Sequence, residues 1–137
     1  MEYAEKNKLN IMGTIKGAAV AGVKPEIMGI CPVDATKKAI EHANKINGTS
    51  LTLNDIDVVE LNEAFAAQSL AVLKELGLSQ EKGNINGGAI AIGHPLGASG
   101  ARILGEALVV LKQTNGKTGL ATMCIGGGQG IATIVEA

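Results

Sequence analysis

A lone histidine set among glycines, His94, constrains this chain more than any other feature. It lies in residues 84–102, which read Asn-Ile-Asn-Gly-Gly-Ala-Ile-Ala-Ile-Gly-His-Pro-Leu-Gly-Ala-Ser-Gly-Ala-Arg, just before a helix-forming run. Proline restricts the backbone and glycine adds no bulk, so the backbone fixes where the ring points while its surroundings stay open. A lone histidine is more often structural or solvated, but this setting favours a functional one.

A second glycine cluster follows a thiol. Residues 122–130 read Thr-Met-Cys-Ile-Gly-Gly-Gly-Gln-Gly, so an apolar strand ends near Cys124 and three glycines follow, beginning at Gly126. Without side chains, this segment leaves backbone N–H groups facing whatever lies beyond the strand end. A cysteine in such a place can otherwise be an inert buried residue. We expect the His94 imidazole and the Cys124 sulfur to converge at neighbouring strand ends.

A third motif, Asn62-Glu63-Ala64-Phe65, stands where a short strand gives way to a helix. Asn62 could simply cap that helix, because its side-chain oxygen can accept a hydrogen bond from the first helical turn. It could equally present its amide to a reacting group. The residues alone leave both interpretations open.

The apolar pattern predicts an α/β fold, a layered mixed sheet of about five strands with helices on both faces. Residues 10–137 are expected to form the domain, and residues 1–9 the tail of a truncated helix. The expected strands are 11–23, 57–61, 119–125 and 130–136, the last two as an antiparallel hairpin. The expected helices open at Pro32, after Asn62 and near residue 98. The helix over about 98–112 is apolar around most of its circumference, which predicts that it is buried.

Two sets of side chains are expected to point inward. On the helix that opens at Pro32, an apolar stripe has the spacing of one helix face. The stripe consists of Ala35, Ala39, Ile40, Ala43 and Ile46. The helix that ends near residue 76 is expected to bury Phe65, Leu70, Leu73 and Leu76.

Composition excludes several classes of function. A chain of 137 residues is long enough for one domain with its own core, but only Tyr3 and Phe65 are aromatic, so aliphatic side chains must build that core. The net charge of −1 gives no indication that the chain binds nucleic acid or a membrane surface. No apolar segment has the length of a membrane span or the form of a signal peptide, and a cytoplasmic protein is the default expectation. No P-loop or nucleophile elbow is present.

The two cysteines are too few for a disulfide framework, and with His94 they are too few for a zinc site, so no metal is expected. Cys31 directly precedes Pro32, at the expected helix N-cap, where the helix dipole favours a thiolate. We interpret Cys31 as structural or incidental, with redox reactivity as the alternative. His42 lies at the edge of an apolar stripe, which favours a boundary role over catalysis.

Taken together, the three motifs resemble the carboxyl-terminal half of thiolases, the family of acetyl-CoA acetyltransferases and 3-ketoacyl-CoA thiolases. The resemblance covers nearly the whole chain. It implies that His94 takes the proton from a cysteine nucleophile and helps to hold the thioester oxyanion. It further implies that Cys124 moves the α-proton of acetyl-CoA, with the Gly126 N–H as one oxyanion donor, and that Asn62 positions a water in the other oxyanion hole.

The same resemblance implies a role for the residues after Asn62. Ala64 and Phe65 would flank the path of the pantetheine arm of coenzyme A, and Glu63 would pack against the glycine motifs. The substrates would be coenzyme A thioesters, in the condensation of two acetyl-CoA or the thiolysis of acetoacetyl-CoA, with no covalently bound cofactor.

In the family, the acyl group is carried by a cysteine of the amino-terminal half, and neither Cys31 nor Cys124 lies in such a motif. The resemblance therefore implies a partner, an amino-terminal thiolase half, and an isolated chain that is inactive. The face that meets that half is expected to be exposed and to drive self-association, so a homo-oligomer is expected. The alternative is a non-catalytic domain that acts as a scaffold or a self-associating module.

Overall fold

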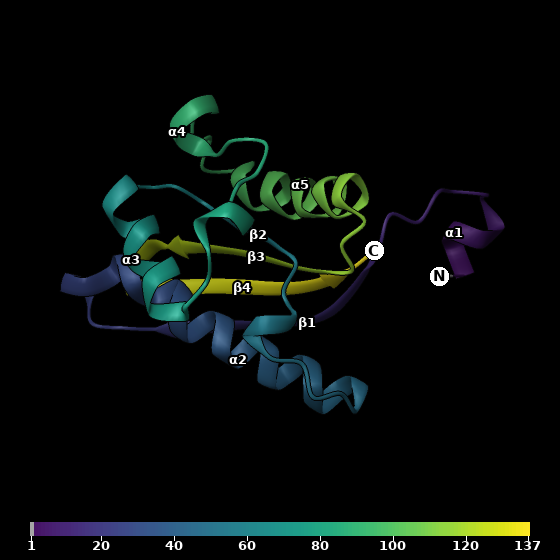
Figure 1. The fold of residues 1–137 in the computed structure, drawn as a ribbon, viewed down its shortest axis with the longest axis horizontal. Coiled ribbons are helices and arrows are strands. Elements are labelled where there is room, and N and C mark those ends of the chain that lie inside the picture. The colour runs from purple at the N-terminus through teal and green to yellow at the C-terminus, as the bar shows by residue number, and fades with distance from the viewer. Residues whose placement is uncertain (1) are drawn as a thin grey trace.

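The computed structural model describes residues 2–137 as a mixed β-sheet with helices on both faces (Figure 1). Within these residues the sheet has four strands in the order β1-β4-β3-β2, where about five were expected. The elements are α1 (Glu2–Lys6), β1 (Thr14–Gly22), η1 (Pro25–Ile30), α2 (Cys31–Asn47), η2 (Leu53–Asp55), β2 (Val58–Leu61), α3 (Ala66–Leu76), η3 (Gln80–Lys82), α4 (Ala89–Ile92), α5 (Ser99–Thr114), β3 (Thr118–Ile125), η4 (Gly126–Gly128) and β4 (Gln129–Glu136).

The pairing of the strands decides which loops meet. β4 lies antiparallel between β1 and β3, and the β3–β4 hairpin closes through η4 as expected. β2 pairs parallel with β3, with Leu61 opposite Thr122. Carboxyl ends of parallel strands lie at one edge of a sheet. The Asn62 motif and the Cys124 motif therefore meet at the same edge.

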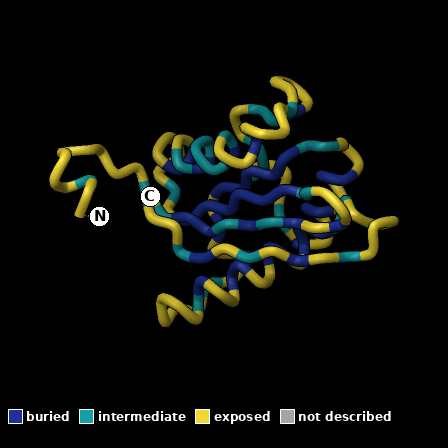
Figure 2. The backbone as a smooth tube through the Cα atoms, turned by 180° about the vertical axis from the view of Figure 1, so that it is seen from behind, coloured by how far each residue is buried: buried dark blue, intermediate teal, exposed yellow. Residues whose placement is uncertain are grey.

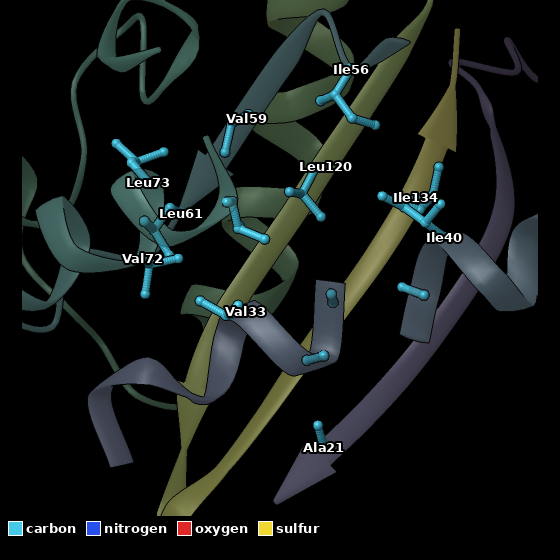
Figure 3. Close-up of a cluster of buried hydrophobic side chains, with 14 of the residues drawn as sticks. Ala21, Val33, Ile40, Ile56, Val59, Leu61, Val72, Leu73, Leu120 and Ile134 are labelled. Atoms are coloured by element: carbon cyan, nitrogen blue, oxygen red, sulfur yellow. The ribbon is translucent and has the colours of Figure 1, made fainter. Parts of the chain in front are cut away.

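α2 covers one face of the sheet and the larger core lies beneath it. Figure 3 shows side chains of α2, α3 and the strands converging there, among them Ile40, Val72, Leu120 and Ile134, all of which are buried. β1 can approach α2 closely because Gly17 has no side chain; a Cβ there would lie 2.7–2.8 Å from Ala43.

The expected apolar stripe of α2 is correct except at its end. Ala35, Ala39, Ile40 and Ala43 are buried, but Ile46 is 61% exposed because the last turn of the helix extends beyond the core. His42 is exposed, as expected for a boundary residue, and its Nδ1 lies 2.8 Å from the Ala18 carbonyl oxygen.

α5 covers the other face of the sheet, and the expectation that it is buried around most of its circumference was wrong. Its buried residues, Ser99, Ile103, Ala107, Val110 and Leu111, form one stripe. Leu104 and Leu108 are half-buried and Val109 is exposed, so part of the apolar surface of this helix stays open to solvent. In Figure 2 the helix accordingly alternates between buried and exposed positions, whereas the central strands are mostly buried.

The expected burial of Phe65 and Leu70 was also wrong. Leu73 and Leu76 are buried, but Phe65 is 63% and Leu70 51% exposed. Phe65 precedes α3 with an extended backbone, so its side chain leaves the stripe that packs on the sheet, and Leu70 lies on the outer side of the helix. α1 lies away from the sheet (Figure 1) and buries no residue.

Candidate active site

The first candidate group, His94, is fixed at both ring nitrogens. It lies between α4 and α5, where Gly93 takes a φ of 93° that favours glycine. Its Nδ1 is 2.7 Å from the Ser99 Oγ, and its Nε2 is 3.2 Å from the Asn62 Nδ2. These bonds come from the start of α5 and from the end of β2, so two separate layers of the fold hold the ring.

The partners of Ser99 determine which ring nitrogen carries the proton. The Ser99 hydroxyl donates to the Pro95 carbonyl oxygen at 3.1 Å, and a hydroxyl has one proton to give. The His94 Nδ1–H must then donate to the Ser99 Oγ, which leaves a lone pair on Nε2. That lone pair accepts from the Asn62 amide. The arrangement therefore presents Nε2 as the basic atom of the ring.

Asn62 does not cap a helix. The N-cap residue of α3 is Phe65, and Asn62 lies fully buried directly after β2, where its backbone N–H donates to the Thr122 carbonyl oxygen at 3.0 Å. Its side-chain nitrogen faces His94, while its Oδ1 is buried without a hydrogen-bond partner. The structure thus rules out the helix-cap interpretation, and a functional role for the Asn62 amide stays a prediction.

Sequence reasoning missed Asn84, which holds the Asn62 motif in place. The Asn84 side chain accepts from the Leu61 N–H at 2.9 Å and donates to the Leu61 carbonyl at 2.8 Å and to the Glu63 Oε1 at 2.9 Å. The other Glu63 oxygen accepts from the Ile90 N–H at 2.9 Å, and a Cβ on Gly88 would lie 2.5 Å from the carboxyl group. Glu63 therefore packs against the first glycine cluster, as expected. Asn84 has a left-handed φ of 46°, which the sequence alone does not reveal.

Cys124 is half-buried near the end of β3, opposite Gly130 of β4. Burial raises the pKa of its thiol above the ordinary value, partly opposed by its own backbone N–H. Side chains alternate along a strand, and Met123 packs with Ile103 of α5, so the thiol leaves the sheet on the α2 side. The expectation that both groups lie at strand ends was therefore wrong for His94, which reaches this edge from the loop between α4 and α5, in the layer opposite to the Cys124 thiol. Their convergence on a single substrate stays a prediction.

Cys31 was expected at the N-cap of α2, but it is the first residue of the helix and the N-cap is Ile30. It is fully buried, and its Sγ lies 2.6 Å from the Met28 carbonyl oxygen and 2.8 Å from that of Gln129. Burial, and to a smaller extent the charge of Cys124, raise the pKa of this thiol. The expected stabilisation of a thiolate by the helix dipole is therefore outweighed, and the contacts fit a structural thiol.

The remaining predicted site residues lie at the same edge. Gly126 is exposed in η4, and no atom lies within 4 Å of the position that a Cβ would take. Ala64 is half-buried next to the Asn62 carbonyl oxygen, to which its N–H donates at 3.1 Å, and Phe65 is exposed. Gly126 and Phe65 are thus open to solvent at this edge.

A small cavity of about 120 Å³ lies behind Asn62, between β2 and α5. Glu60 lines it and is 2% exposed, and its Oε1 has no hydrogen-bond partner. Burial first, and then the charges of Glu106 and Glu63, raise the pKa of this carboxyl from 4.5 to about 7, while Arg102 opposes the rise. Nothing in the sequence pattern distinguishes Glu60 from an ordinary strand residue, so sequence reasoning missed it.

Residues 2–137 contain neither a metal-binding cluster nor a membrane-spanning helix. No group of three or more His, Cys, Asp or Glu side chains in this part of the chain could hold a metal ion. No described helix has the length and hydropathy that crossing a membrane requires.

The sequence of this chain matches known proteins along nearly its whole length. The family model for the C-terminal domain of thiolase matches residues 9–137. The chain is 53% identical over 135 residues to an acetyl-CoA acetyltransferase of Chromobacterium violaceum, covering 98% of this chain and 33% of the relative. It is 55% identical over 136 residues to a 3-ketoacyl-CoA thiolase of Marinomonas, covering 97% and 33%.

Solved structures extend the likeness to the fold. The crystal structure of human mitochondrial 3-ketoacyl-CoA thiolase in complex with CoA superposes with a TM-score of 0.90 and 46% identity, over 99% of this chain and 33% of that one. The chain thus spans about a third of the length of the proteins that it matches. With a match to the family model over residues 9–137, the chain belongs to the thiolase family and corresponds to its carboxyl-terminal domain.

Proposed function

We propose that this chain supplies the acid/base and oxyanion groups of an acetyl-CoA acetyltransferase, which condenses two acetyl-CoA or cleaves acetoacetyl-CoA with coenzyme A. The observation that carries the proposal is the hydrogen-bonded series from Asn62 through His94 to Ser99. It leaves a basic nitrogen at an open sheet edge, beside an amide that can hold an oxyanion or a water.

In the first half-reaction, a cysteine of the amino-terminal portion attacks the thioester carbonyl. His94 Nε2 takes its thiol proton, and the coenzyme A thiolate leaves as the acyl–cysteine bond forms. The contact between Nε2 and the Asn62 amide, 3.2 Å long, is at the weak end of the range for such bonds, so an incoming thiol can displace it. The freed amide then remains available to the oxyanion.

In the second half-reaction of condensation, Cys124 removes the α-proton of a second acetyl-CoA. The resulting carbanion attacks the acyl–cysteine carbonyl, and the C–C bond forms as the cysteine thiolate leaves. In thiolysis the same thiol returns a proton to the departing enolate. Its raised pKa keeps it protonated near neutral pH, which suits the cleavage direction.

The surroundings of the site support a partner that covers it. Four apolar side chains around this edge, Phe65, Ile90, Ile92 and Leu96, are each between 63% and 80% exposed. Exposed apolar groups in one region mark an interaction surface. In this proposal the amino-terminal portion of a thiolase covers them and brings the nucleophile, and the complete enzyme is a homo-oligomer.

The test combines this chain with an amino-terminal thiolase half and measures thiolysis of acetoacetyl-CoA by coenzyme A. The pair should be active and the chain alone inactive. His94→Ala and Cys124→Ser should each reduce kcat about 100-fold or more, because each removes a proton-transfer group. His42→Ala, at an exposed ring far along α2, is the matched control and should retain activity. An assembled pair that remains inactive would instead favour a non-catalytic, self-associating domain.

A further inference from the structure

Two buried oxygen atoms next to the candidate site have no hydrogen-bond donor. They are the Oδ1 of Asn62 and the Oε1 of Glu60, from residues that are 0% and 2% exposed. The two residues lie two positions apart along the chain, so their side chains leave the backbone on the same face and line the same cavity. A buried acceptor without a hydrogen-bond donor destabilises the fold, so a molecule other than the protein is needed to donate to these two oxygens.

The cavity has the properties of a water site. Its volume of about 120 Å³ has room for several water molecules, and polar side chains line much of it, including Asn84, Asn86 and Arg102. Polar cavities of this size hold ordered water, whereas cavities that remain dry are lined by apolar groups. A water molecule donates two hydrogen bonds, which is the number that these two acceptors lack.

We propose that Glu60 is a positioning residue of the candidate site: it holds ordered water in this cavity, and the water fixes the Asn62 side-chain oxygen so that the amide nitrogen stays turned toward His94. The role in catalysis rests on the proposed function, whereas the contact itself does not. Glu60 reaches no substrate and acts through Asn62.

The alternative orientation of the amide shows why an anchor is needed. If the Asn62 side chain turned over, its oxygen would face the His94 Nε2 lone pair, because the Nδ1–H is committed to Ser99. The nitrogen would then face the cavity, where an ionised Glu60 would accept from it. The protonated form of Glu60 instead adds a donor on the cavity side and favours the observed orientation. The raised pKa of this carboxyl is consistent with that form.

Hydrogen exchange of side-chain amides, measured by NMR, can test whether Glu60 fixes the Asn62 side chain. The measurement does not require the protein to be catalytically active. Glu60→Leu removes both the donor and the water ligand, and the exchange of the Asn62 side-chain amide should become about fivefold faster, as expected for the loss of one hydrogen bond. Glu60→Gln keeps a donor of the same size, so exchange should stay within about twofold of the wild type.

The Asn84 side chain provides the internal control. It also borders the cavity, but its bonds go to Leu61 and Glu63, so its exchange should not change. If Glu60 had only a packing role, Glu60→Leu would accelerate both amides equally through lower global stability. Equal acceleration, or an unchanged Asn62 rate, would overturn the proposal.

The wild type gives a second measurement if Glu60→Leu does not fold. The charged groups that face Glu60 are Glu106 and Arg102 from α5 and Glu63 from the loop after β2. As Glu60 ionises between pH 6 and pH 8, the ratio of Asn62 to Asn84 exchange should rise about fivefold, and a constant ratio would contradict the anchor. Neither exchange measurement requires catalysis. Both can therefore be interpreted even if the thiolase pair shows no activity.

Discussion

Replacing Glu60 with Gln should change how the stability of the domain depends on pH. The folded state raises the pKa of this carboxyl from 4.5 to about 7, so between these values the native state binds more protons than the unfolded state. The proton on Glu60 stabilises the folded state fully below pH 4.5, and this stabilisation is lost as the pH rises toward 7. At about 1.36 kcal/mol per tenfold change in proton affinity, the loss is at most about 3 kcal/mol. Water in the cavity screens the charge, so we expect roughly half of that value.

The assay is urea unfolding followed by circular dichroism at pH 5, 6, 7 and 8. Glu60→Gln does not titrate, so it should gain about 1–2 kcal/mol relative to the wild type between pH 5 and pH 8. Glu106→Gln removes the neighbouring charge that contributes most to the rise in the Glu60 pKa. In this variant the stability of the domain should therefore depend less on pH. Wild type and Glu60→Gln curves that stay parallel over this whole range would refute the account of Glu60 as a carboxyl whose ionisation opposes folding.

Three further substitutions test the packing and the site, each by urea unfolding at pH 6. Leu120→Ala deletes a fully buried side chain in the core under α2 and should cost about 2–5 kcal/mol. Gly130→Ala places a Cβ 2.7 Å from the α2 backbone and should cost at least about 1–3 kcal/mol, whereas Gly22→Ala has open space and should stay within about 0.5 kcal/mol; similar costs for the two would contradict the close approach. Ser99→Ala leaves the His94 Nδ1–H without an acceptor and should cost about 1–3 kcal/mol, and no change would argue against this hydrogen bond.

The sequence predicted the framework of the site well because the framework depends on local patterns. Apolar runs gave β3, β4 and the helices to within a few residues, and the glycine cluster after Cys124 predicted the hairpin. His94 and Asn62 were selected from separate motifs 32 positions apart, and the structure joins them by a hydrogen bond. The sequence predicted each as a site residue, but it did not predict the direct contact between them, which depends on how α5 packs on the sheet.

The predictions were wrong where burial is determined by packing between segments that are distant in the sequence. A hydrophobic residue such as Phe65 or Leu70 is expected inside, but its exposure depends on which helix face meets the sheet, and that face is set by the packing of α3. The same applies to α5, because only the packed structure shows which of its apolar side chains face the sheet. Asn84 and Glu60 were missed because their roles depend on atoms brought close only by folding.

The first turn of α5 links the stability of the domain to the geometry of its candidate site. Ser99 holds the His94 ring, and the Arg102 Nη1 donates to the Gly93 carbonyl oxygen at 2.7 Å, so one helix turn fixes both the ring and the backbone beside it. The next residue, Ile103, packs with Met123, the neighbour of Cys124 on β3. The apolar contact that seats α5 on the sheet therefore also sets the position of the imidazole relative to the strand that carries the thiol. Movement of α5 would displace His94 from Asn62 before it disturbed the core under α2, which lies on the opposite face of the sheet.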